Sequence, residues 1–485
     1  MRHKLKYIAV LGFGAVLYSS CKRELLEPQL QTSVSDASAF DTPTRISNLV
    51  LSLYSSLKSG SFYGGRGVVY GDIRGEDFIN ETSNLVTASD VWNLNLANSA
   101  TSVKSYWSAG YNAINNCNIF LDGMAAKGSA VVGATLANNY IAEARLIRAL
   151  SYYSLLQVFA RPYADGAGAK PGLPLRLKGI VGPGFSDLER STVAEVYTQI
   201  LSDLDFAETN LPVTNSSAYN NVTRAHRNTA IALKTRVYLS MQKYDKVITE
   251  ANKIVTTTPP FTATSGVAHA LQADITNVFK TPYTTTESIM SMPMTTTSGD
   301  FPGTQNSLCS YFYMAGSTPG ATEFSLNPNG ILANAGWTAT DKRKSLIFTN
   351  TAGKKFVSKY TTGSPYTDYV PVIRYAEVLL NLAEAKVRNS NTVDAQSLLL
   401  LNAVRGRSDA STVLAPATVP ALLDAILTER RIEFFGEGLR NIDLMRLMQT
   451  IPSKGSAPTK APSDAGYIWP ISSDELSLNR LMKDN

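Results

Sequence analysis

Long amphipathic runs without glycine or proline constrain the fold of this chain more than any other feature. The stretch YIAEARLIRALSYYSLLQVFA spaces its apolar residues three and four positions apart, which is typical of one face of an α-helix. STVAEVYTQILSDLDFAETNLP predicts a second helix, with Ser191 or Thr192 as N-cap and Glu195 on its first turn. NTAIALKTRVYLSMQKYDKVITEANKIV predicts two helices that separate near residues 242–243. Residues 141–255 therefore resemble tetratricopeptide hairpins, which stack because one hairpin cannot bury its apolar face.

A second helical section follows Pro371. VIRYAEVLLNLAEAKVRN predicts a strongly amphipathic helix, and TVDAQSLLLLNAVRGRSD predicts its partner. VPALLDAILTERRIEFFGEGLRNIDLMRLM predicts the longest helical run, which a glycine-bearing break interrupts. The chain is therefore predicted to be mainly α.

The segment between these sections, residues 281–340, has a different composition. It contains three acidic side chains and no lysine or arginine, and it is rich in Thr, Ser, Gly, Asn and Pro. This composition predicts loops and short strands. Long irregular segments are usually functional or disordered, and the aromatic residues of this one argue against disorder; they are Tyr283, Phe301, Tyr311, Phe312, Tyr313, Phe324 and Trp337.

Residues 1–20 have the form of a secretory signal peptide. A basic tip precedes an apolar run of about 12 residues, too short for a membrane span, and the small residues Ser19 and Ser20 come before Cys21. Cys21 is either an incidental thiol near a cleavage site or the acylated N-terminus of a mature bacterial lipoprotein. The small residues favour the lipoprotein, although Tyr18 occupies the position where leucine is usual.

Composition excludes several classes of function. The formal net charge is +6, of which three charges lie in the leader, so 6 − 3 = +3 remains, too little for a concentrated nucleic-acid-binding face. The three histidines are scattered, so we predict no metal site and no cofactor. Cys117 and Cys309 could form a disulfide or remain two buried thiols.

Glu429 and Glu433 are the most tempting catalytic pair, one helical turn apart in TERRIEFFGEG. The two catalytic carboxyl groups of a glycosidase, however, lie on opposite sides of the scissile glycosidic bond in a cleft. They are about 5 to 9.5 Å apart. Arg430 and Arg431 are interleaved with the glutamates, which favours an ion-paired structural helix. We therefore predict that the protein is not an enzyme.

Several motifs occur in a characteristic order along nearly the whole chain; they are CKRELLEPQ, EARLIRALSYY, RSTVAEVYTQILSDLDFAETNLP, IRYAEVLLNLAEAKVR and LNAVRGRS. The most specific are ILTERRIEFFGEGLRNIDLMR and the terminal YIWPISSDELSLN. Together these motifs resemble the SusD/RagB family of surface glycan-binding lipoproteins of the Bacteroidetes.

The resemblance implies a scaffold of four tetratricopeptide-like helix pairs that carries long irregular loops and short strands. It implies acylation of Cys21, a location on the outer face of the outer membrane with the lipid as the only anchor, and a SusC-like TonB-dependent transporter as partner. We expect a signal peptide at 1–20 and one domain at 21–485, with the scaffold at about 40–60, 100–255 and 370–450 and the ligand-binding loops at about 61–99 and 256–369.

Sugar binding requires aromatic faces for stacking and planar polar groups for the hydroxyls. The 281–340 segment and YGDIRGEDFINETSNLVTASDVWNLNL both supply this mixture. Family members place a tryptophan three residues before an asparagine, and Trp92 and Asn95 match that spacing, although core packing is an alternative for Trp92. The expected ligand-binding residues are Arg74, Asp77, Trp92, Asn95, Tyr283, Tyr311, Tyr313 and Trp337.

The resemblance implies capture of an oligosaccharide or polysaccharide and its delivery to the transporter. Capture of peptides or glycopeptides, as in the RagB branch, stays open, as does a structural lid without affinity of its own. A glycoside hydrolase is disfavoured because no catalytic motif is present. The near-absence of charge in residues 281–340 suits a neutral sugar, and the sequence does not indicate which one.

Overall fold

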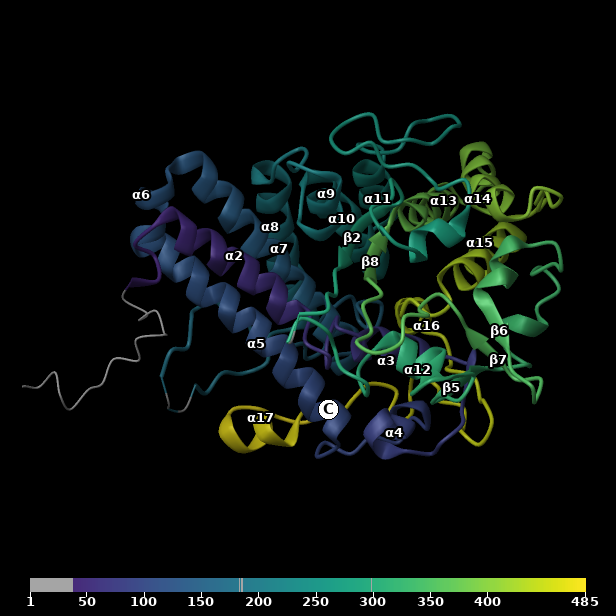
Figure 1. Ribbon diagram of the computed structural model, residues 1–485, viewed down its shortest axis with the longest axis horizontal. Helices are drawn as coiled ribbons and strands as arrows, with labels where there is room; N and C mark the ends of the chain where they lie inside the picture. The colour runs from purple at the N-terminus through teal and green to yellow at the C-terminus, as the bar shows by residue number, and fades with distance from the viewer. Residues whose placement is uncertain (1–37, 183, 185, 298) are drawn as a thin grey trace, which may run out of the picture.

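The computed structural model describes residues 38–182, 184, 186–297 and 299–485, so Cys21 and the leader lie outside the described residues. The protein is mainly helical, as predicted (Figure 1). The longer helices form the scaffold; they are α2 (Pro43–Leu57), α5 (Thr101–Gly123), α7 (Ala134–Phe159), α8 (Val193–Asn210), α10 (Arg227–Ser240), α11 (Tyr244–Ala251), α13 (Tyr375–Ser390), α14 (Ala395–Ser408) and α15 (Val419–Phe434).

These helices pack on one another approximately in chain order. Helix α7 contacts α5 and α8, α10 contacts α8 and α11, and α13 contacts α11, α14 and α15. Figure 1 shows the resulting row, from α2, α5 and α7 at one end of the molecule to α13, α14 and α15 at the other. No helix within the described ranges is both long and apolar enough to cross a membrane.

Local sequence signals explain where the predicted helices begin and end. Thr192 caps α8 and forms a capping box with Glu195, because each side chain accepts from the other residue's backbone N–H. Gln242 adopts a positive φ of 56° between α10 and α11, which ends the first helix at the predicted position.

The shorter elements lie mostly among the loops. The short helices are α3 (Arg66–Ile73), α4 (Ser89–Trp92), α6 (Ser129–Val132), α9 (Ala218–Thr223), α12 (Leu308–Phe312), α16 (Arg440–Arg446) and α17 (Ser473–Leu478). The strands form antiparallel pairs; they are β1 (Phe78–Asn80) with β5 (Phe324–Leu326), β2 (Ser288–Met292) with β8 (Val370–Arg374), β3 (Met314–Ala315) with β4 (Thr318–Pro319), and β6 (Ile347–Thr349) with β7 (Lys355–Val357).

Strand β8 corrects one prediction. The run VIRY was expected to begin a helix, but α13 starts only at Tyr375 and the preceding residues pair with β2. All five residues of β8 are buried, so tertiary pairing with β2 outweighs the local helical periodicity. Pro371 also disfavours a helical conformation at Val370.

The core is largely continuous and includes the C-terminal motif YIWP. Trp469 is fully buried, and its ring centroid lies 5.3 Å from that of Tyr70 and 5.8 Å from that of Tyr106. Its backbone N–H donates to the carbonyl oxygen of Val158 at 2.8 Å. The motif therefore ties the end of the chain to α3, α5 and α7.

Cys117 and Cys309 are both free and buried, so of the two alternatives open from the sequence the structure selects two buried thiols. Burial raises the pKa of the Cys309 thiol to about 12. It raises the pKa of the Cys117 thiol as well.

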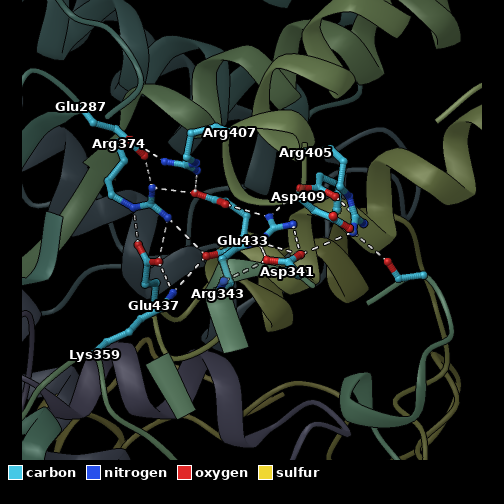
Figure 2. A network of polar contacts seen from close by, with 12 residues as sticks. Glu287, Asp341, Arg343, Lys359, Arg374, Arg405, Arg407, Asp409, Glu433 and Glu437 are labelled. Atoms are coloured by element: carbon cyan, nitrogen blue, oxygen red, sulfur yellow. Dashed lines mark hydrogen bonds and ion pairs between the residues drawn. The ribbon is translucent and has the colours of Figure 1, made fainter. Parts of the chain in front are cut away.

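A buried ion network joins the loop segment to the C-terminal helices (Figure 2). Glu433 of α15 lies 2.9 Å from Arg374, 2.6 Å from Arg407 and 2.9 Å from Arg343. Glu429 lies 2.5 Å from the same Arg343. The predicted ion-paired structural helix is thus confirmed.

The partners differ from those expected. Arg430 and Arg431 do not pair with the glutamates beside them; Arg430 binds Asp443 at 2.9 Å and Arg431 binds Asp77 at 2.5 Å. Neighbours in a helix sequence point in different directions, so the glutamates on the opposite face meet arginines from other elements. The surrounding arginines hold the pKa of the fully buried Glu433 well below its usual range, against the raising effect of burial.

Candidate ligand-binding face

Trp92 lies in the core. Its side chain is 4% exposed, and its indole N–H donates to the carbonyl oxygen of Phe78 at 2.7 Å. The Nζ atom of Lys454 lies 5.7 Å from the ring centroid. The ring has no free face for a sugar, so the packing alternative holds for Trp92.

Arg74 and Asp77 are also buried. Arg74 donates to the side chain of Asn441 at 2.9 Å and to the carbonyl oxygen of Tyr467 at 2.7 Å. Asp77 forms an ion pair with Arg431 and accepts from the backbone N–H of Ile331 at 2.7 Å. The polar atoms of both side chains bind other residues of the protein. Arg74 and Asp77 therefore stabilise the loops from within the core.

Two of the expected aromatic residues are buried too. Tyr311 is 0% exposed and stacks on Phe324, with ring centroids 6.1 Å apart. Trp337 is 3% exposed and packs against Phe435 at 5.3 Å. Large rings stabilise the protein most when they leave water, and here they hold the long loop segment on the scaffold. The expectation of direct ligand contact is therefore corrected for Arg74, Asp77, Trp92, Tyr311 and Trp337.

Tyr283, Tyr313 and Asn95 remain accessible. Asn95 is exposed in the loop after α4, and Tyr313 is half-buried with its ring against Phe348 at 5.6 Å. Tyr283 is half-buried and adopts a positive φ of 61°. These three residues are the part of the expected site that solvent reaches.

Tyr283 forms a pair with Tyr369, which we call the tyrosine pair. The two rings stack with centroids 4.5 Å apart and planes inclined by 14°. The Tyr283 hydroxyl donates to Asp368 at 3.0 Å, and Thr362 donates to the same carboxylate through its backbone N–H and its hydroxyl, each at 2.8 Å. Burial, together with the Asp368 charge, raises the pKa of Tyr283 to about 12, so the hydroxyl stays protonated at neutral pH.

A groove of about 560 Å³ lies between β1, β5 and the turn that joins β6 to β7. We call it the hairpin groove. Ile79 and Leu332 are apolar parts of its lining, and Glu81 accepts from the Ser325 hydroxyl at 2.5 Å. Its remaining polar side chains include Asn329, Lys354 and Lys355.

The buried residues of the expected site support this groove. A Cβ atom added to Gly455, which lines the groove, would lie 3.0 Å from the Trp92 ring. Asp77 holds the backbone of Ile331, the residue before Leu332. Trp92 and Asp77 therefore lie beneath the lining of the groove.

A succession of neighbouring loop residues leads from the tyrosine pair towards the hairpin groove. Thr362 binds Asp368, and a Cβ atom on the next residue, Gly363, would lie 3.1 Å from Met314. Tyr313, beside Met314, packs on Phe348 of β6, and the β6–β7 turn lines the groove. Both features are therefore built by loop residues: the tyrosine pair lies next to the start of β8, and the groove lies at β1, β5 and the β6–β7 turn.

Sequence analysis missed Tyr369, Asp368 and Lys355. Tyr369 and Asp368 lie in YTTGSPYTDY, outside the segment chosen for its lack of charge. That stretch combines Gly, Pro and Thr with aromatic residues, the same loop signal that singled out residues 281–340. Within the described ranges, no group of three or more metal-ligating side chains of the His, Cys, Asp and Glu types comes together.

The fold is a helical scaffold that carries a face built from loops and short strands. Residues 26–239 match the family model described as "Starch-binding associating with outer membrane", and residues 312–485 match that of the SusD family. The crystal structure of a SusD superfamily protein from Bacteroides fragilis is 34% identical, covers 92% of this chain and 100% of that chain, and superposes with a TM-score of 0.82. The chain belongs to the SusD family.

Curated relatives agree with this assignment. SusD-like protein P38 from Formosa agariphila is 23% identical over 527 residues, covering 99% of this chain and 98% of the relative. SusD-like protein P25 from the same organism is 24% identical over 285 residues, and there the match spans 57% of this chain and about half, 49%, of the relative. A surface glycan-binding protein from Bacteroides thetaiotaomicron, solved in complex with laminarihexaose, shares the fold at a TM-score of 0.73 and 17% identity, over 92% of this chain and 99% of that one.

Proposed function

We propose that this protein captures oligosaccharides at the cell surface and passes them to a SusC-like TonB-dependent transporter of the outer membrane. The observation that carries the proposal is the half-buried tyrosine pair in a SusD fold. The laminarihexaose complex of the B. thetaiotaomicron relative supports the same class of ligand.

The tyrosine pair has the properties that a sugar site requires. A pyranose ring has apolar C–H groups on its faces, which gain free energy when an aromatic ring removes them from water. The stacked arrangement of Tyr283 and Tyr369 holds both rings at a defined angle, so little side-chain entropy is lost on binding. The hairpin groove offers amide and charged groups for sugar hydroxyls, which set orientation.

Attachment to the membrane belongs to the same proposal. We place the protein on the outer face of the outer membrane, anchored only by the acylated Cys21. The family of the chain and the form of its leader support this location.

Catalysis is not part of the proposal. Glu429 and Glu433 are both 0% exposed, and both bind Arg343, so this pair has no access to a glycosidic bond. Capture of peptides, the alternative left open by the sequence, is an outcome that the following experiment separates.

Binding should be measured by calorimetry with laminarihexaose and a panel of neutral and acidic oligosaccharides. A dissociation constant between micromolar and millimolar corresponds to roughly 4 to 8 kcal/mol. Replacing Tyr283 or Tyr369 by Ala should weaken binding by about 1 to 2 kcal/mol, a factor of roughly 5 to 30, because each removes one stacked ring. Tyr244→Ala, on α11 of the scaffold, is the matched control and should bind like the unaltered protein.

The proposal fails if the unaltered protein binds none of these oligosaccharides, and binding of a peptide library alone would favour the RagB-like alternative. If oligosaccharides bind but both tyrosine variants bind normally, the sugar site lies elsewhere on the surface. Thermal melting of each variant shows whether a loss of binding reflects unfolding.

A further inference from the structure

Basic residues of the loop region concentrate in one short segment. Residues 341–360 contain six lysines and arginines and a single carboxylate, Asp341, whereas residues 281–340 contain neither lysine nor arginine. Arg343 and Lys359 belong to the buried ion network. Asp341 is fully buried and binds Arg343 at 2.6 Å, so it does not pair with a surface lysine.

Most of the remaining lysines have no acidic partner. Within the described part of the chain, Lys354 pairs with Glu81, but Lys342, Lys344 and Lys355 form no ion pair within 4.0 Å. Lys355 is exposed, and its Nζ atom is 3.5 Å from the hydroxyl of Thr349. The charged side chains that line the hairpin groove are Lys354, Lys355 and Glu81, so together they carry one net positive charge.

Lys344 is a second lysine that forms no ion pair in the described part of the chain, and it lies outside the lining of the groove. Its Nζ atom lies 4.8 Å from the ring centroid of Trp337, which restricts the side chain. Burial lowers the pKa of Lys344, and the charge of Lys355 lowers it further, while Asp341 opposes both. In the groove, the ammonium group of Lys355 forms no ion pair with the described residues, which leaves a positive field that an anion would stabilise.

We infer that the hairpin groove binds an anionic group of the glycan, a uronate carboxylate or a sulfate ester, through Lys355. The inference rests on the proposed function and names the substrate class: an acidic rather than a neutral polysaccharide. It revises the preference for a neutral sugar, which came from residues 281–340 alone. The apolar lining at Ile79 and Leu332 receives the ring, and Asn329 is available to its hydroxyls.

A lysine ammonium group is a point charge that can bind anions of several shapes, so Lys355 could bind either a carboxylate or a sulfate. No proton is transferred and no bond is broken. The electrostatic attraction between the lysine and the anion is partly exposed to solvent, so added salt screens it and weakens binding.

The test compares pairs of oligosaccharides that differ only in charge. Oligogalacturonate is measured against its methyl ester, and a sulfated galactan oligosaccharide against its desulfated form, by calorimetry at low and high salt. We expect the charged member of at least one pair to bind more tightly by about fivefold at low salt, and this advantage to shrink at high salt. The two pairs distinguish a carboxylate from a sulfate.

Lys355→Gln should remove most of this advantage, so that the charged and the neutral member of a pair bind with similar affinity. Lys246→Gln, an exposed lysine on α11, is the control and should keep the full difference. Equal binding of charged and neutral members by the unaltered protein overturns the inference while the proposed function stands. Absence of binding by every oligosaccharide overturns both.

Discussion

Phe435 shows how a single ring holds the loop segment on the scaffold. It is 4% exposed, its ring lies 5.3 Å from that of Trp337, and the Nζ atom of Lys359 lies 4.2 Å from its centroid. It follows α15 directly and so connects the end of that helix to residues from two different loops. Its loss would remove an apolar contact and one face of a cation–π interaction together.

Phe435→Ala should lower the free energy of unfolding by about 3 to 5 kcal/mol, because truncating a buried phenylalanine leaves a cavity. Urea denaturation followed by circular dichroism measures the change. Leu478→Ala, at a leucine that is 64% exposed, is the control and should change stability by less than about 0.5 kcal/mol. A Phe435→Ala protein as stable as the control would contradict the packing described here.

At the scale of elements, two histidines join the start of α10 to the segment before β2. His226 precedes α10 and His269 lies in the loop that leads to β2. Both are 0% exposed, and their rings stack with centroids 5.2 Å apart. Burial lowers the pKa of His226 to about 3 and that of His269 to about 4, and for His226 the neighbouring His269 adds to the effect.

This pair should make the fold sensitive to acid. The pKa of each histidine is about 6.5 in the unfolded chain and lower in the folded protein, so the unfolded state binds more protons below that pH. Their stabilising contribution is complete above about pH 6.5 and is lost as the pH falls towards 4, by up to roughly 1.4 kcal/mol per pH unit for each histidine.

Urea denaturation at several pH values between 6.5 and 4.5 measures this slope. A His226→Gln/His269→Gln variant should be less stable overall but should lose less stability per pH unit over that range. Identical slopes for the two proteins would show that the histidines do not titrate as the structure requires.

At the scale of the whole molecule, the buried ion network makes the loop region and the helices one unit. Its members come from β8, α14, α15 and the segment before β6, and Figure 2 shows how their side chains meet. Charges in such a network are costly to bury, and removing one partner of a buried pair usually costs about 3 to 5 kcal/mol. The helices thereby support the tyrosine pair and the hairpin groove, although few helical residues line either.

Anchoring is also a property of the whole molecule. Cys21 lies outside the described residues, so the prediction rests on its leader and on the family. Cys21→Ala should release the protein from the membrane fraction, because the acyl chains on this residue would be its only attachment. Stable anchoring requires more than one chain, since a single chain holds only marginally. Fractionation of cells that lack the transporter is the measurement, and a variant that stays with the membrane would contradict the lipoprotein assignment.

The sequence by itself determined the helical scaffold, the family and the structural role of Glu429 and Glu433. Helix periodicity and the capping box at Thr192 are local signals, which act within a few residues. The family motifs are likewise continuous stretches. These features could be predicted because they do not depend on which distant segment becomes a neighbour.

Only the tertiary structure decided which loop residues meet solvent. Trp92 and Tyr283 both belong to aromatic loop sequences, yet Trp92 is buried beneath Gly455 and Tyr283 is half-exposed against Tyr369. Burial of a loop residue depends on partners far away in the chain, and irregular segments carry no periodicity that marks an inner face. For the same reason, only the folded chain shows that β8 pairs with β2 and that Lys355 and Ile79 line the same groove.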